Sequence, residues 1–176
     1  MNEIIRKNGI TYGIITGAIS ILITTLIYVI NIKLFISPWI GFSSIAIYII
    51  IGVVLLSKTR KELKGFFSFK DAFTTYFISA VIGILISVAF NIILFNFIDP
   101  GMKDTIKELT IKYTAEMLQK FGTPTSAIND AIKELDANDQ FSVFKLLQGS
   151  IFSILFSALF GLILAAIFRT KPSYQE

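Results

Sequence analysis

Four long apolar runs, separated by polar connections, dominate the chain, and each is long enough to cross a membrane. We expect spans at about residues 10–32, 39–57, 72–98 and 143–168, with no ionisable residue away from their ends. At about 1.5 Å per helical residue, a run of about 20 residues covers the roughly 30 Å apolar core of a bilayer. The pattern therefore predicts an all-α integral membrane protein, with residues 1–176 forming one membrane domain built as a four-helix bundle.

The segment 99–140, between the third and fourth runs, is polar and holds eight acidic residues and five lysines. Its apolar residues recur at spacings of three and four, which predicts two short amphipathic helices joined around Gly122. Asp99 and Pro100 form the predicted start of the first helix. The expected apolar stripes are Ile106, Leu109, Tyr113 and Met117 in the first helix, and Ile128, Ala131, Ile132 and Leu135 in the second.

Neither short helix can bury its apolar stripe alone. Three arrangements of this extramembrane hairpin therefore stay open. The helices can pack on each other or on the span ends around Trp39 and Phe97, they can lie on the membrane, or they can bind a partner.

The distribution of basic residues sets the expected orientation. The net charge is +4, and nine of the sixteen Lys and Arg residues, including every arginine, lie in the two termini and the second connection. Cytoplasmic loops carry an excess of Lys and Arg, so we expect both termini in the cytoplasm and 99–140 outside. Phe66, Phe67 and Phe69 fit the membrane–water boundary. We assign orientation, or contact with anionic lipids, rather than nucleic-acid binding, to Lys58, Arg60, Lys61, Lys64, Lys70, Arg169 and Lys171.

Small residues recur at a spacing of four in three of the spans. Residues four apart share one helix face, and small side chains there let two helices approach closely in lipid. We expect at least one of these rows to pack inside the bundle, and the alternative is homo-oligomerisation through one row. The rows are Gly9, Gly13 and Gly17 in the first span, Ser79, Gly83 and Ser87 in the third, and Gly149, Ser153, Ser157 and Gly161 in the fourth.

The chain offers little catalytic chemistry, because it contains no His and no Cys. This removes thiol nucleophiles, imidazole bases and the usual zinc and haem ligands. We therefore expect no enzymatic activity, cofactor or metal site. The leading hypothesis is a structural or accessory protein that interacts with a membrane partner or with itself. The alternative is a small-solute transporter or channel component, which requires a cavity that reaches the middle of the membrane.

Two blocks of the sequence carry a resemblance to a known family. Residues 65–73 read GFFSFKDAF, where Ser68 and Asp71 have the spacing of a helix capping box, and residues 165–172 read AAIFRTKP. With the four spans, these blocks resemble an uncharacterised bacterial family of small four-span inner-membrane proteins, common in the Bacteroidetes and described as a domain of unknown function. The resemblance implies the bacterial inner membrane as the location and implies no activity, substrate or catalytic residue.

Overall fold

The computed structural model describes residues 2–170, and all regular secondary structure in that range is helical. Four of the elements are long and apolar enough to cross a membrane: α1, α2, α3 continued by η2, and α6. The predicted all-α class with four candidate spans is confirmed. The elements are α1 (Glu3–Ile30), η1 (Ile32–Ile36), α2 (Pro38–Glu62), α3 (Phe69–Ile93), η2 (Leu94–Ile98), α4 (Met102–Lys120), α5 (Thr125–Ala137) and α6 (Val143–Phe168).

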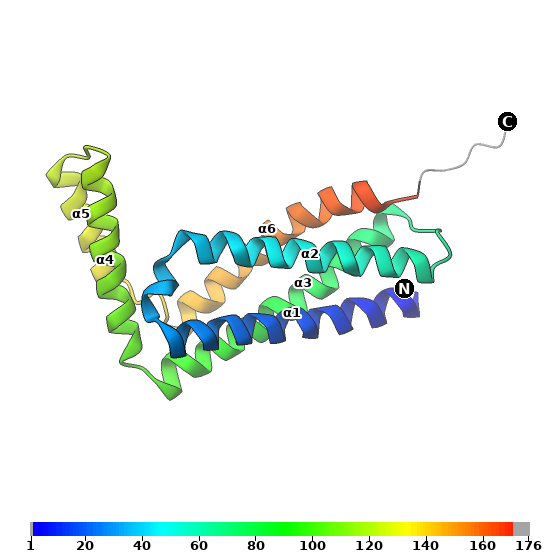
Figure 1. The fold of residues 1–176 in the computed structure, drawn as a ribbon, viewed down its shortest axis with the longest axis horizontal. Helices are drawn as coiled ribbons and strands as arrows, with labels where there is room; N and C mark the ends of the chain where they lie inside the picture. The colour runs from blue at the N-terminus through cyan, green and yellow to red at the C-terminus, as the bar shows by residue number, and fades with distance from the viewer. Residues whose placement is uncertain (1, 171–176) are drawn as a thin grey trace.

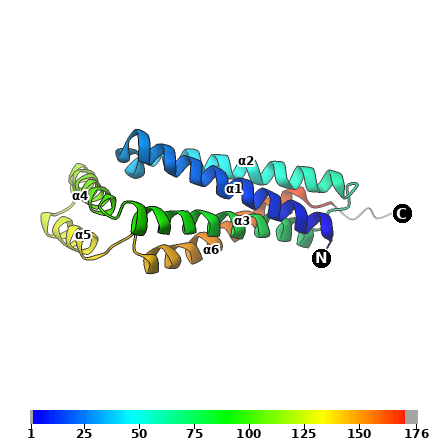
Figure 2. The same ribbon diagram turned by 90° about the horizontal axis from the view of Figure 1, so that it is seen from below.

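The four long helices lie side by side along the long axis of the molecule, and α4 and α5 form a hairpin at one end (Figure 1). We call this the hairpin end. The start of α1, the α2–α3 connection and the end of α6 meet at the opposite end, which we call the basic end (Figure 2). Helix α3 is central, since it packs extensively against both α1 and α6, whereas α2 makes fewer contacts with its neighbours.

Local sequence explains where several helices begin. Pro38 occupies the first turn of α2, where its missing N–H is not needed. At the start of α3, Ser68 Oγ accepts a hydrogen bond from the Asp71 N–H at 3.1 Å and donates one to Asp71 Oδ2 at 2.7 Å. The predicted capping pair therefore forms, although the shorter Asp bonds the Ser68 hydroxyl where a Glu would reach its backbone N–H. Lys64 and Gly65, both with positive φ, turn the chain between α2 and α3.

Several helix boundaries differ from the sequence prediction. Helix α1 begins at Glu3 and α2 continues to Glu62, so both helices extend into polar sequence beyond the apolar runs. Helix α4 begins at Met102 rather than at Pro100. Asp99 still acts at this helix start, because its Oδ1 accepts the Met102 N–H at 3.2 Å across a turn. A helix continues into polar sequence as long as its backbone hydrogen bonds continue. Hydropathy marks only the apolar run and so does not show where the helix ends.

The base of the hairpin packs on the span ends around Phe95 rather than around the predicted Trp39 and Phe97. Phe95 is fully buried and contacts the Phe35 ring at 5.7 Å and the Phe141 ring at 4.4 Å between centroids. Trp39 and Phe97 are 79% and 74% exposed. The π-helical geometry of η2 changes which residues of this segment face inward.

Candidate functional site: a hydroxyl-lined groove beside α2

The tightest helix contact in the bundle joins α1 to α3. A Cβ built on Gly13 would lie 2.7 Å from Ile82 Cβ, which is shorter than real carbon contacts. The same holds for Gly9 against Ile78 at 2.9 Å and Gly17 against Ile86 at 2.6 Å. Three isoleucines on α3 thus pack directly against three glycines on α1. No larger residue fits at these glycine positions unless the helices shift.

The predicted α3 row lies at the same contact and adds polar bonds to it. A Cβ on Gly83 would meet Thr16 Cγ2 at 2.9 Å, and Ser79 is buried. Towards the hairpin end, Ser20 Oγ and Ser87 Oγ share a hydrogen bond of 2.7 Å. The structure therefore brings the first-span and third-span rows together within one monomer.

The α6 row divides into two parts. Gly161 is buried, and a Cβ there would lie 2.8 Å from the Tyr76 ring, while the Ser157 hydroxyl lies 3.4 Å from the Tyr76 hydroxyl. Gly149 and Ser153 are exposed, and a Cβ on Gly149 meets no described atom within 4 Å. Packing inside the monomer thus fails for Gly149, because open space lies beside this position, although Ser150 in the same turn is buried.

Tyr76 of α3 also fixes the distance between α2 and α6. A Cβ on Gly52 of α2 would lie 2.8 Å from Tyr76 Cε2 and 3.2 Å from Leu164 of α6. The Tyr76 ring is therefore held between two glycines, one on α2 and one on α6. From Gly52 towards the basic end α2 has buried residues, whereas between Pro38 and Ile51 it has none.

The basic end of the bundle is closed. Leu55, Leu56 and Thr59 of α2 and Ala72 of α3 are all 0% exposed. Leu56 packs in a cluster with Phe67, Ala72, Leu164 and Ala165.

Phe67 belongs to this buried cluster and not to the membrane boundary, where the sequence placed it. Its side chain is 1% exposed, in contrast to Phe66 at 82%. The Phe67 N–H donates to Thr170 Oγ1 at 3.0 Å, and the Thr170 N–H donates to Phe67 O at 2.8 Å. These two hydrogen bonds to Thr170, which follows α6, hold Phe67 inward, and the sequence carries no local signal for them.

A polar junction at the basic end was missed from the sequence. Asn8 of α1 is 3% exposed, and its Nδ2 donates to Thr59 Oγ1 at 3.2 Å and to Glu62 Oε2 at 2.8 Å on α2. A buried amide satisfied in this way ties the two helices together. Asn8 lies before the first apolar run, so a search for polar residues inside the spans does not reach it.

Between the hairpin end and the middle of the bundle, α2 is separated from its neighbours by two cavities of about 420 and 380 Å³. Ser20 and Tyr48 line both, so the cavities adjoin, and we call them together the groove. The deeper cavity lies at the centre of all four long helices. Eight of its lining residues carry a hydroxyl group: Thr16, Ser20, Tyr48, Tyr76, Ser79, Ser87, Ser153 and Ser157.

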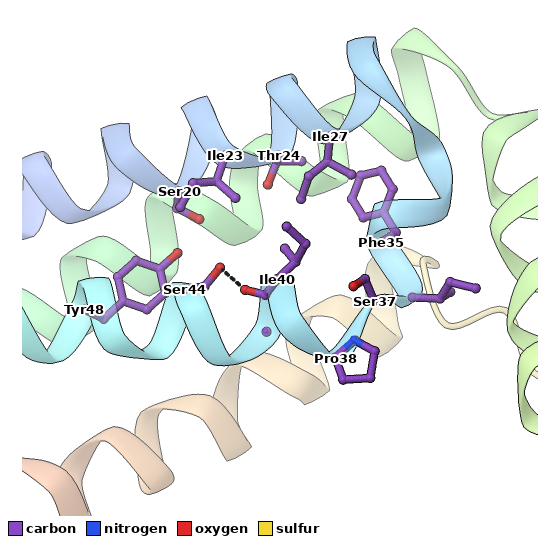
Figure 3. A pocket seen from close by; sticks show the side chains of 12 residues that line it. Ser20, Ile23, Thr24, Ile27, Phe35, Ser37, Pro38, Ile40, Ser44 and Tyr48 are labelled. Atoms are coloured by element: carbon purple, nitrogen blue, oxygen red, sulfur yellow. Dashed lines mark hydrogen bonds between the residues drawn. The ribbon is translucent and has the colours of Figure 1, made fainter. Parts of the chain in front are cut away.

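The outer cavity lies between α1 and α2, as Figure 3 shows. Side chains from α1, including Ser20 and Thr24, face those from α2, including Ser44 and Tyr48 (Figure 3). The Ser44 hydroxyl donates to its own helix at Ile40 O, at 2.8 Å. Phe35 and the α2 start at Pro38 border the cavity towards the hairpin end. Within residues 2–170, no acidic or basic side chain lines either cavity.

The basic residues singled out from the sequence lie away from the groove. The described members are exposed at the basic end: Lys58, Arg60, Lys61, Lys64, Lys70 and Arg169. Lys58 lies over the Tyr12 ring at 5.6 Å and 4.0 Å from Glu62. Lys171 lies outside the described residues.

Charged contacts at the hairpin end hold α4 against the chain that precedes α6. Lys103 Nζ lies 3.0 Å from Asp139 Oδ2 and 3.3 Å from Asn96 Oδ1, and Asn96 Nδ2 donates to Phe141 O at 3.0 Å. Partial burial opposes ionisation of Asp139, but the Lys103 ammonium and the Phe141 N–H outweigh it, so the pKa of this carboxyl lies below its ordinary value. These contacts are structural, because each polar group already has a partner.

Comparison with known proteins gives a family and no activity. Within residues 2–170 no group of three or more acidic side chains is placed to hold a metal ion. No curated protein and no solved structure matches the chain. The family model described as "Protein of unknown function (DUF4199)" matches residues 11–170. The match covers most of the chain, and the protein therefore belongs to the DUF4199 family.

Proposed function

We propose that the protein binds a small neutral molecule in the groove between α2 and the α1–α3–α6 layer. The observation that carries this proposal is the pair of adjoining cavities, which extend from the hairpin end to the centre of the bundle. Each cavity falls within the roughly 300–1,000 Å³ typical of ligand sites. A transmembrane helix of a partner is far larger than this space, so the volume favours a small molecule.

The lining determines the chemistry of the occupant. Hydroxyl groups on an otherwise apolar wall can bond a hydroxyl or carbonyl group, and no acidic or basic side chain among the described residues offers a counter-charge. A charged molecule there would lose its hydration without gaining a partner. The occupant we propose is neutral, with an apolar body and a hydroxyl or carbonyl group. The proposal includes no catalytic step, cofactor or metal.

Because the basic end is closed, the groove is accessible only from its other sides. Leu55, Leu56 and Thr59 are fully buried below it, so a molecule enters from the hairpin end or from the lipid and stops near Tyr76. Passage across the bundle would need α2 to separate from Ala72 and Leu164. The arrangement supports a binding protein or a component of a solute-transport system, and it argues against a permanently open channel.

Native mass spectrometry of protein released from its own membrane tests the proposal. Ser153 lines the deeper cavity and bonds only its own helix, at Gly149 O, so Ser153→Trp fills the groove with little other change. Gly149→Trp, one turn away in open space, is the matched control. We expect a neutral adduct on the wild type and on Gly149→Trp that is lost in Ser153→Trp. An equal adduct on all three proteins, or none on any, contradicts the proposal.

An accessory role, in which the protein associates with a membrane partner or with itself, is a second proposal. The open space beside Gly149 favours it, because this part of the α6 row could receive another helix closely. Gly149→Cys in a chain without native cysteine should form disulfide dimers in membranes, and Ile151→Cys on the opposite face of α6 should not. Equal dimer formation at both positions would point to random collision.

We infer that the membrane is the bacterial inner membrane, with both termini and the basic end in the cytoplasm and the hairpin outside. The exposed basic residues at one end support this orientation through the excess of Lys and Arg in cytoplasmic loops. Lipids are the partner we propose for these residues, since each juxtamembrane Lys or Arg near an anionic surface contributes about 1 kcal/mol. Contact with lipids accounts for these basic residues, so we do not propose that the protein binds nucleic acid.

A further inference from the structure

Helix α4 runs across the hairpin end rather than along the spans. Figure 1 shows it at a steep angle to the four long helices, and Figure 2, turned by 90°, shows it nearly end-on. The turn between α4 and α5 projects past α2 in Figure 1. One end of α4 is thus fixed on the bundle, and the other extends beyond the bundle's edge.

One face of α4 is fixed by its contacts at the base. Ile106 is 3% exposed and packs with Leu94 and Phe95 at the end of the third span, and α4 contacts η1 there. This face of the helix therefore points towards the span ends. Since the helix turns by about 100° per residue, residues 7 and 11 positions further on share the direction to within about 20°. These residues are Tyr113 and Met117.

Exposure along this face increases from the base to the tip. Ile106 is 3% exposed and Tyr113 and Met117 are each 38% exposed. Phe121, which directly follows the last residue of α4 and lies about 60° from the direction of Ile106, is 80% exposed. The side chains on this face remain apolar towards the tip of α4, although the rest of the protein covers them less there. Helix α5 packs on α4, with Ile128 buried, but leaves Tyr113, Met117 and Phe121 exposed.

We propose that Tyr113, Met117 and Phe121 rest in the membrane–water interface, with the lipid surface beyond the bundle's edge as their partner. The four long helices that cross the membrane fix its level at the hairpin end, and the stripe faces that level. Trp39, Phe97 and Ile98, close to the span ends at the same end of the molecule, are apolar and exposed as well. An amphipathic helix lying in the interface buries its apolar face by a few ångströms, and Tyr suits that depth.

Environment-sensitive labels test this placement in the full-length protein in liposomes of neutral phosphatidylcholine. The chain has no native Cys, so an NBD fluorophore can be attached to Met117→Cys or Tyr113→Cys, both at partly exposed positions. Gln119→Cys, exposed and pointing about 140° away from Ile106, is the matched control on the same helix.

We expect blue-shifted emission at Met117 and Tyr113 that phospholipid carrying a nitroxide near the top of its acyl chain quenches at least twofold. At Gln119 we expect emission typical of water and little quenching by that lipid. Equal behaviour at the three sites overturns the inference. So does a blue shift at Met117 that nitroxide lipid fails to quench, because another protein copy would then cover the stripe.

Discussion

Gly13 on α1 and Ile82 on α3 are so close that a Cβ on the glycine would lie 2.7 Å from the isoleucine Cβ. Gly13→Leu therefore forces the two helices apart, and overpacking of this kind destabilises by about 1–3 kcal/mol or more. We expect a lower midpoint of thermal unfolding in detergent and loss of the Ser20–Ser87 hydrogen bond, because that bond depends on the same approach.

Gly149→Leu is the matched control for Gly13→Leu. Both changes place the same side chain on a glycine of a spanning helix, but Gly149 has open space where Gly13 has Ile82. The control should unfold within about 0.5 kcal/mol of the wild type. Equal destabilisation by the two variants would mean that general helix effects, and not the α1–α3 contact, set the outcome.

Tyr76 is predicted to act through its ring rather than through its hydroxyl. The ring fills the space between Gly52 and Gly161, while the hydroxyl lies 3.4 Å from Ser157 Oγ, at the long end for a hydrogen bond. Tyr76→Ala should destabilise by about 3 kcal/mol, at the low end of the range for aromatic truncations, because the ring is half-buried. Tyr76→Phe should change stability by less than about 1 kcal/mol. Equal losses in the two variants, measured by equilibrium unfolding, would assign the role to the hydroxyl.

The ion pair of Lys103 and Asp139 predicts a weak acid sensitivity at the hairpin end. The pKa of Asp139 is lower in the folded protein than in the unfolded chain, so the pair stabilises fully above about pH 4 and is lost as the pH falls through the folded value. The Asp139 side chain is 47% exposed, so solvent screening limits the effect to below about 1 kcal/mol.

Hydrogen exchange of the α4 amides measures this effect. Exchange should accelerate in the wild type as the pH falls below about 4, after correction for the intrinsic rate. Asp139→Asn should exchange faster near neutral pH and lose the additional dependence in that window. A wild type and a variant with parallel pH profiles would show that another group controls the hairpin.

The predicted orientation in the membrane can be tested at two exposed lysines at opposite ends of the molecule. Lys64 lies in the α2–α3 turn at the basic end and Lys120 at the end of α4. A membrane-impermeant maleimide added to intact cells should label Lys120→Cys, and should label Lys64→Cys only after the membrane is broken. The reverse pattern would place the termini outside and would refute the orientation inferred from the basic residues.

The sequence was sufficient to predict the helices, but not to predict which face of each helix packs against its neighbours. Hydropathy located the four spans, and Ser68, Pro38 and Gly122 marked helix ends, because these signals are local. The small-residue rows looked alike in α1 and α6, yet Gly13 packs tightly and Gly149 meets open space. Helix rotation depends on packing between segments far apart in the chain, and a spacing of four alone does not encode it.

The groove was beyond prediction for the same reason. The separation of α2 depends on Tyr76, which contacts Gly52 and Gly161 across three helices, and the closed basic end depends on Phe67 pairing with Thr170. The serines that line the groove read equally well as packing residues in the sequence. Their common wall exists only once α1, α3 and α6 are assembled.

The most direct test of a neutral molecule in the groove is photolabelling in liposomes with hexadecanol carrying a diazirine. Mass spectrometry then maps the labelled residues. We predict adducts on groove residues such as Tyr48, Tyr76 and Ser157 that are lost in Ser153→Trp and retained in Gly149→Trp. Adducts confined to outward-facing residues such as Phe152 and Leu155, and unchanged by either substitution, would contradict binding in the groove.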